Sequence, residues 1–241
     1  MNVIPHEIFK AYDIRGIVGK TITADNVEKI GHAIGSEARA RKLTAIAIGR
    51  DGRLSGTELS QALARGIRKS GIHVVDVGMV ATPMLYYAAH ELCQYSGVMV
   101  TGSHNPPEYN GFKIVLGGQT LAAETIQALR LRLENNDLTH GAGDYSEHAI
   151  VNTYIERITG DIKLTRPIKI VVDCGNGVTG AFAPALYRGL GCEVIELFCE
   201  VDGSFTNHHP DPSVPDNLKD VVQALKTTGA EIGRASDGGG N

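Results

Sequence analysis

Several patterns that would assign a function directly are missing from this 241-residue sequence. Its four cysteines form no CxxC pair and no dense framework, so buried free thiols are expected rather than disulfides. The net charge is −4, and no cluster of lysines and arginines marks a nucleic-acid or membrane-surface footprint. No apolar run approaches the ~20 residues of a membrane span, and residues 1–10 lack a signal-peptide pattern. We therefore expect a cytoplasmic protein with no nucleic-acid and no membrane partner.

What the sequence does contain is a regular alternation of apolar runs and helical patterns. Hydrophobic residues make up 42% and charged residues 21%, which is enough apolar material to bury a core. The alternation is typical of α/β units with largely parallel sheets. The predicted strands are 44–49, 72–77, 97–101, 111–116, 168–173, 192–198 and a short segment at 231–236, and the predicted helices are 57–70, 84–92, 124–135, 181–190 and 217–228.

The order strand, glycine-rich turn, helix, glycine, strand occurs twice, at 44–77 and again at 168–198. This repeat predicts two similar three-layer α/β domains, each a mixed, mostly parallel sheet flanked by helices, at residues 1–150 and 151–241. The boundary is expected in the polar segment 141–154. In open α/β sheets, ligands bind beyond the carboxyl ends of the strands. The loops at 101–110 and at Asp237 are therefore expected to face one another across a cleft.

The segment TGSHNPPEYNGFK, residues 101–113, carries the densest chemistry. Ser103 follows an apolar strand, and two prolines stiffen the loop after it. A rigidly held serine beside a histidine and a lysine is a plausible nucleophile, since His104 can exchange a proton and Lys113 can stabilise phosphoryl oxygens. The same residues also make a good turn sequence. The residues alone leave both interpretations open.

A second pattern suggests a different chemistry. Residues 175–180, GNGVTG, form a literal GxGxxG between a strand and a helix, with acidic residues further on. This is the dinucleotide-binding fingerprint, so an NAD(P)-dependent oxidoreductase is the alternative function. Against it, the equivalent turn of the first repeat, 50–56, does not fit the fingerprint. No Walker A motif is present, which excludes a P-loop kinase. The adjacent His208 and His209 favour a polar loop over a metal site, because neighbouring side chains on an extended segment point to opposite faces.

The segment TGSHNPPEYNGFKI resembles the active-site loop of the α-D-phosphohexomutases, and the chain is similar to the N-terminal half of the bacterial phosphomannomutase/phosphoglucomutase group. Further motifs that fit this family are AYDIRG (11–16), GRDGR with LSG (49–56), DVGMVATP (76–83), VVDCGNGVTG (171–180) and NHHPDP (207–212). The likeness covers nearly the entire chain. It implies an isomerase that interconverts hexose 1-phosphate and hexose 6-phosphate, of mannose, glucose or both, through a phosphoserine and a hexose 1,6-bisphosphate.

The resemblance also implies roles for single residues. Ser103 would be the phosphoserine, with His104 and Lys113 as the acid/base and electrostatic groups. Arg15 would hold phosphoryl oxygens, and Tyr12 would line the same cleft. Two structural alternatives remain open: Arg15 is only an ion-pair partner, or His104 only hydrogen-bonds the loop.

In the family, the Mg²⁺ loop has the sequence DGDGDR or DGDADR, and this chain departs from that pattern. The resemblance implies Mg²⁺ bound by phosphorylated Ser103 and by Asp237 with two further carboxylates. Gly239 and Asn241 stand where those carboxylates belong. The expectation is therefore a chain truncated in its metal loop, poor at binding Mg²⁺ and inactive as a mutase. A non-catalytic sugar-phosphate-binding remnant is the third possibility.

Overall fold

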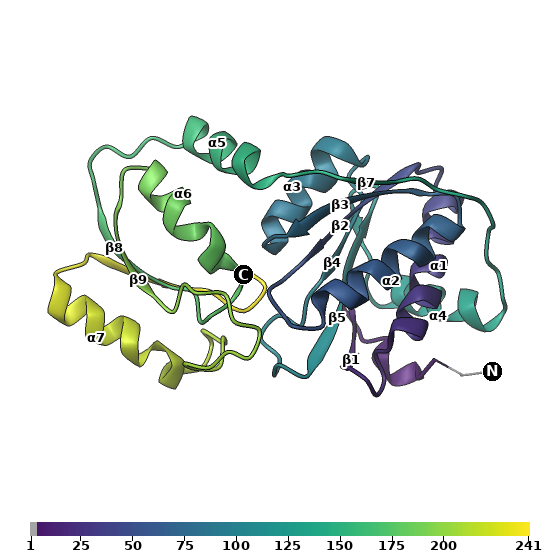
Figure 1. Ribbon diagram of the computed structural model, residues 1–241, viewed down its shortest axis with the longest axis horizontal. Coiled ribbons are helices and arrows are strands. Elements are labelled where there is room, and N and C mark those ends of the chain that lie inside the picture. Colours follow the sequence, from purple (N-terminus) through teal and green to yellow (C-terminus); the bar gives the residue numbers. More distant parts are fainter. Residues whose placement is uncertain (1–3) are drawn as a thin grey trace.

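The computed structural model describes residues 4–241 as an α/β protein with two sheets, so the predicted class is confirmed (Figure 1). The strands are β1 Ile14–Ile17, β2 Ala45–Arg50, β3 His73–Met79, β4 Gly97–Val100, β5 Tyr109–Leu116, β6 Gln119–Thr120, β7 Tyr145–Glu147, β8 Lys169–Asp173, β9 Glu193–Leu197 and β10 Ile232–Ala235. The helices are α1 Ala24–Ala40, α2 Gly56–Lys69, α3 Thr82–Leu92, α4 Glu124–Glu134, α5 Val151–Asp161, α6 Ala183–Gly189 and α7 Lys219–Thr228, with 3-10 turns η1 His6–Ile8, η2 Val178–Ala181 and η3 Pro215–Leu218.

The larger sheet has the order β1-β5-β4-β2-β3-β7, and β6 pairs with β5. Strands β4, β2, β3 and β7 run parallel, whereas β5 pairs antiparallel with β4, and β1 pairs antiparallel with β5. Alternate residues of β2 face opposite layers: Ile46 and Ile48 join the core under α1, α2 and α4, and Ala47 joins the core under α3. Because helices cover both faces of this sheet, the central strands are continuous apolar runs in the sequence.

The smaller sheet repeats the central part of the larger one. Its order, β10-β8-β9, matches β4-β2-β3, and all pairings in both triplets are parallel. Helices α6 and α7 flank it, and they appear on opposite sides of it in Figure 1. The internal repeat seen in the sequence is thus a repeated fold unit.

The last strand carries polar residues at its end, Arg234 on β10 and Ser236 directly after it. Strand β10 is an edge strand with exposed residues, so its polar side chains do not interrupt a buried strand. The Arg234 guanidinium lies 5.8 Å from the ring centroid of Tyr187. The hydroxyl of buried Ser236 is 2.7 Å from that of Thr179. Both groups have partners that the linear sequence does not reveal.

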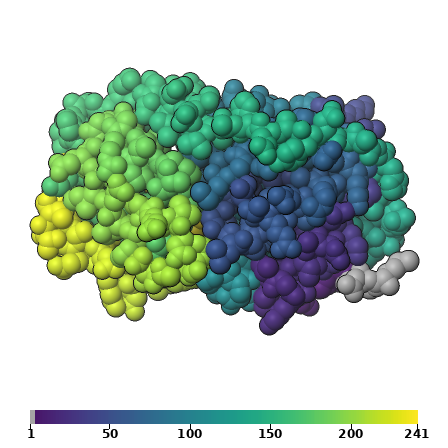
Figure 2. Space-filling view, in the orientation of Figure 1, coloured from purple at the N-terminus to yellow at the C-terminus, as the bar shows by residue number. Residues whose placement is uncertain are grey.

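The two units are joined by more than the chain. Val178 and Phe182 of the second unit belong to the same apolar cluster as Ala81 and Met84 of the first. Figure 2 shows the green and yellow unit packed directly against the blue one.

The proposed boundary at residue 150 lies between β7 and α5. The segment before it is hydrogen-bonded rather than open, since Gly143 N donates to Arg68 O at 2.9 Å and β7 pairs with β3.

This pairing is expected to protect residues 141–147 from proteolysis. Backbone in a sheet resists cleavage, whereas exposed irregular segments are cut first. Residues 162–167 between α5 and β8 have no regular structure and are largely exposed. Limited digestion with a broad-specificity protease should therefore cut within 162–167 before 141–147, as mapped by mass spectrometry of the fragments. First cleavage within 141–147 would show that β7 is detached in solution.

Candidate active site

Ser103 lies in the loop that follows β4, at the carboxyl edge of the larger sheet. Its φ angle is +53°, in the left-handed region that a serine rarely occupies, and the residue is buried. The backbone N–H of Ser103 donates to Thr101 Oγ1 at 2.8 Å, and Thr101 Oγ1 donates to Asp51 Oδ2 at 2.7 Å. Such a conformation persists only when neighbouring groups enforce it. The loop therefore holds the serine hydroxyl in one defined place.

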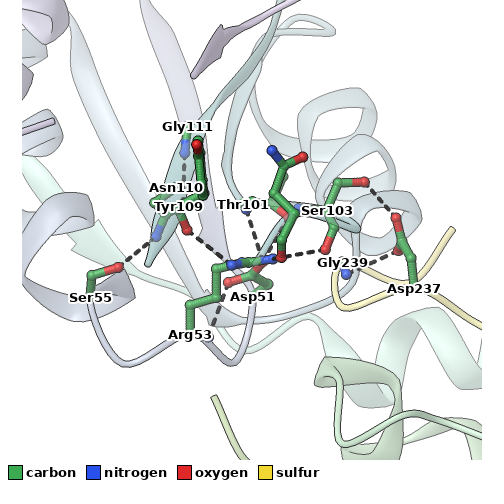
Figure 3. A network of polar contacts seen from close by, with 12 residues as sticks. Asp51, Arg53, Ser55, Thr101, Ser103, Tyr109, Asn110, Gly111, Asp237 and Gly239 are labelled. Carbon is green, nitrogen blue, oxygen red and sulfur yellow. Dashed lines mark hydrogen bonds and ion pairs between the residues drawn. The ribbon is translucent and has the colours of Figure 1, made fainter. Parts of the chain in front are cut away.

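The Arg53 guanidinium is the main clamp on this loop (Figure 3). Its side chain is fully buried. Nη2 donates to Ser103 O at 2.9 Å and to Asn105 O at 2.7 Å, while Nη1 donates to Pro106 O at 2.6 Å and to Tyr109 O at 3.0 Å. Four carbonyl groups of one loop thus converge on one planar cation. Only the fixed fork of an arginine offers donors in this arrangement.

Arg53 also has a buried counterion. Its Nε lies 3.3 Å from Asp51 Oδ2, although the N–H is not aligned for a hydrogen bond. Burial raises the pKa of Asp51, and the charge of Arg53 and the hydrogen bond from Thr101 oppose that rise. We regard the pair as charged, because neutral Asp51 would leave the Arg53 cation buried and uncompensated.

The loop also requires glycine at position 102. A Cβ atom there would lie 2.3 Å from Arg53 Cζ. From the second unit, the ring of Phe205 lies 5.1 Å from Arg53 Cζ and covers the guanidinium. The clamp on the serine loop is therefore completed by both units.

Asp237 reaches the serine from the second unit. Ser103 Oγ donates to Asp237 Oδ2 at 2.5 Å, and both residues are buried (Figure 3). The other carboxylate oxygen, Oδ1, accepts N–H groups from Gly239 at 3.0 Å and from Asn241 at 2.8 Å. A carboxylate hydrogen-bonded to a serine hydroxyl can take its proton, and the two N–H donors fix the carboxylate's orientation. The structure thus joins two residues that lie 134 positions apart in the sequence.

The other residues named from the sequence are more loosely connected. Arg15 Nη1 donates to Asn105 Oδ1 at 2.5 Å and Nη2 is paired with Asp13, so Arg15 touches the serine loop through a side chain. Within residues 4–241, none of the remaining three has a hydrogen bond or ion pair from its side chain: His104 is exposed beside Ser103, Lys113 is half-buried on β5, and Tyr12 is 79% exposed.

The residues near Ser103 do not fit a magnesium site. Mg²⁺ needs an octahedral set of oxygen ligands, usually with more than one carboxylate or phosphate. Here Asp237 is the carboxylate bonded to Ser103, and one of its oxygens already accepts two N–H groups, while Asp51 is paired with Arg53. Across residues 4–241, no group of three or more His, Cys, Asp and Glu side chains is placed to hold a metal. Ser103 and Asp237 are adjacent, as expected for metal ligands, but they are bonded to each other.

The GxGxxG turn does not leave room for a dinucleotide. A Cβ at Gly177 would lie 2.9 Å from Gly238 Cα, and one at Gly180 would lie 1.9 Å from Cys199 O. These glycines allow the chain to pack against itself, so the close approach that a pyrophosphate would use is already taken. The oxidoreductase alternative is not supported.

Sequence reasoning missed Asp51 and Arg53 as parts of the site. Both lie in the GRDGR motif, directly after the buried strand β2 and at the same sheet edge as Ser103. Ligands bind beyond the carboxyl ends of strands in such sheets, so this position in the sequence would have identified both residues. Asp173 was missed as well. It is the buried last residue of β8, and its Oδ2 lies 3.0 Å from His208 Nε2, so the histidine has an acidic partner that spacing did not reveal.

The site defines a class of protein: two α/β units with a strained, clamped serine between them. Residues 6–140 match the family model described as phosphoglucomutase/phosphomannomutase, alpha/beta/alpha domain I. Residues 152–241 match alpha/beta/alpha domain II of the same family. The chain belongs to the phosphoglucomutase/phosphomannomutase family.

Individual relatives are similar over nearly all of the chain. The phosphomannomutase/phosphoglucomutase of Pseudomonas aeruginosa is 57% identical over 238 residues, covering 99% of this chain and 51% of that protein. The phosphoglucomutase of Neisseria meningitidis serogroup A is 59% identical over 240 residues, covering 99% and 52%. A solved family protein from Burkholderia thailandensis has a TM-score of 0.95 at 53% identity, covering 98% and 53%. The chain spans about half the length of these relatives.

No helix within residues 4–241 is long and apolar enough to cross a membrane.

Proposed function

We propose that this chain carries the phosphoserine part of a cytoplasmic hexose-phosphate mutase, in which Ser103 accepts and returns a phosphoryl group. The observation that carries the proposal is the hydrogen bond from Ser103 Oγ to Asp237, in a loop clamped by Arg53. Asp237 takes the hydroxyl proton as the serine oxygen attacks a phosphorus atom of the hexose bisphosphate; the bond from that phosphorus to the sugar oxygen breaks, and the sugar oxygen takes up a proton as hexose monophosphate leaves. Family membership supports hexose 1-phosphate and hexose 6-phosphate as substrates and a hexose 1,6-bisphosphate as intermediate. Mannose and glucose are not distinguished by these residues.

We propose a role for each surrounding side chain from its position. Arg15 would hold phosphoryl oxygens, and its hydrogen bond to Asn105 of the serine loop supports this role. His104 is exposed next to the serine, where it can exchange protons with a substrate hydroxyl. Lys113 and Tyr12, whose side chains have no hydrogen bonds or ion pairs inside residues 4–241, are available to a substrate that enters the site.

Two of the carboxylates expected to bind Mg²⁺ in a mutase of this family are missing from this chain. In the whole family protein Mg²⁺ would neutralise the charge of the transferring group. Gly239 and Asn241 contribute no carboxylate here, and a missing charge stabiliser costs about a hundredfold or more in rate. We therefore propose that Ser103 takes up phosphate slowly and that this chain does not turn over glucose 1-phosphate measurably.

The test is phosphate uptake at Ser103. Incubation of the purified chain with glucose 1,6-bisphosphate should add ~80 Da, one phosphoryl group, mapping by tandem mass spectrometry to the peptide that holds Ser103. Ser103→Ala should abolish the added mass. Ser146→Ala removes an exposed serine on β7 and should leave the added mass unchanged. Phosphate on another residue, or equal uptake by Ser103→Ala, would refute the proposal.

A further inference from the structure

Two cysteines that lie far apart in the sequence touch each other in the smaller unit. Cys174 follows β8 directly, and Cys199 lies two residues after β9. Their Sγ atoms are 3.3 Å apart, with the Cys199 thiol donating to Cys174 Sγ. The four cysteines are free thiols, and these two are the ones in mutual contact. Neither residue belongs to the phosphoryl-transfer site described above.

The two sulfur atoms lie close enough for a disulfide to form after side-chain rotation. Strands β8 and β9 are parallel neighbours, and neighbouring strands lie ~4.8 Å apart. Cys174 N donates to Leu197 O at 3.0 Å, which keeps the two backbones together past the end of β8. A disulfide has a Cα separation of ~4.4–6.8 Å and an S–S length of ~2.05 Å. The sulfurs must therefore approach by roughly 1.3 Å, which side-chain rotation can supply.

The surroundings also favour reaction at this pair over the other thiols. Cys174 is fully buried and Cys199 is half-buried, so Cys199 is the member of the pair that lies nearer to solvent. The hydrogen bond from Cys199 lowers the pKa of Cys174 and raises the pKa of Cys199, so Cys174 is the thiolate of the pair. Burial instead raises the pKa of Cys93, to about 12, and of Cys192.

We propose that Cys174 and Cys199 form a reversible, peroxide-sensitive disulfide. One thiolate attacks a peroxide oxygen, the O–O bond breaks, and a sulfenic acid and hydroxide form. The second sulfur then attacks the sulfenic sulfur and expels hydroxide, closing the S–S bond. In sum, two thiols are oxidised by two electrons, one hydrogen peroxide is reduced, and two waters leave. A dithiol reductant restores the thiols.

The disulfide would restrain the part of the second unit that supports the Asp237 loop. The turn after Cys174 meets that loop directly, since Val178 N donates to Gly238 O at 3.3 Å and Thr179 is bonded to Ser236. Linking Cys174 to Cys199 ties this turn to the end of β9. Oxidation is therefore expected to reduce opening of the turn, a consequence that does not depend on the proposed phosphoryl chemistry.

The experiment treats the purified chain with a small excess of hydrogen peroxide and measures its intact mass and peptide map. We expect a loss of ~2 Da, reversed by dithiothreitol. A peptide linked through Cys174 and Cys199 should accumulate at least tenfold faster than any oxidised form of Cys192. Hydrogen exchange of residues 175–180 should slow at least twofold in the oxidised chain.

Variants separate the pair from general thiol oxidation. Cys199→Ser should eliminate the 2 Da loss while keeping the native circular dichroism spectrum, because the half-buried position tolerates a hydroxyl. Cys192→Ser should leave disulfide formation unchanged. The proposal is overturned if peroxide yields sulfinic acid at Cys199, a disulfide between two chains, or no linked peptide, each of which peptide mapping distinguishes.

Discussion

Replacing Arg53 by alanine should lower the free energy of unfolding by about 3–5 kcal/mol, as expected when one partner of a buried ion pair is removed. The substitution deletes four hydrogen bonds to loop carbonyls and leaves the Asp51 carboxylate buried without its counterion. Ser103 then has no clamp to hold its left-handed backbone. Urea denaturation followed by circular dichroism measures the loss of stability, and the glucose 1,6-bisphosphate assay measures the loss of phosphate uptake.

Two further variants make this prediction specific. Arg157→Ala removes an exposed arginine that pairs with Asp161 on α5, and it should cost less than ~1 kcal/mol, the range for surface ion pairs. Arg53→Lys keeps the charge but lacks the planar fork, so it should restore part of the stability and little of the phosphate uptake. If Arg53→Ala matched Arg157→Ala in stability, the buried pair would not be holding the loop.

Adding one methyl group at Gly66 should destabilise the chain by about 3 kcal/mol, at the upper end for overpacking. Gly66 is buried on α2 where that helix crosses α1. A Cβ atom there would lie 2.0 Å from Glu28 O and 2.8 Å from His32 N, both backbone atoms. Backbone cannot move aside as a side chain can, so Gly66→Ala must push the two helices apart and open the core under them.

Gly160→Ala is the matched control, because Gly160 is also helical but a Cβ atom added there would have no other atom within 4 Å. Alanine has a higher helix propensity than glycine, so this variant should be neutral or more stable by up to ~1 kcal/mol. Thermal and urea unfolding of the two variants side by side measure the difference. Equal stability of Gly66→Ala and Gly160→Ala would mean that α1 and α2 are less closely packed in solution.

The sequence determined the α/β class, the repeat and the serine loop. Central strands such as β2 and β8 are short apolar runs followed by glycine-rich turns, and such local patterns report burial on both sheet faces directly. The loop after β4 was identifiable because a serine, a histidine and two prolines lie within five consecutive residues. These predictions needed no knowledge of distant contacts.

Helices α1 and α5 and strand β1 were not predicted, and each depends on tertiary packing. Helix α1 contains Gly31 and Gly35, which weaken its intrinsic helix propensity but allow close contact with α2. Strand β1 has four residues and is stabilised by antiparallel pairing with β5. Local propensity is a weak prior, so elements that gain most of their stability from packing are missed.

The site itself was decided by the tertiary structure. The sequence predicted that the loops of Ser103 and Asp237 face one another, but only the fold shows that Ser103 Oγ lies 2.5 Å from Asp237 Oδ2. Arg53 looked like part of a turn, and its burial against four carbonyl groups is a property of the folded loop. The same is true of the sulfur contact between Cys174 and Cys199. Spacing along the chain reports local geometry, whereas these contacts arise where separate strand ends meet at one sheet edge, which is fixed by the packing of whole units.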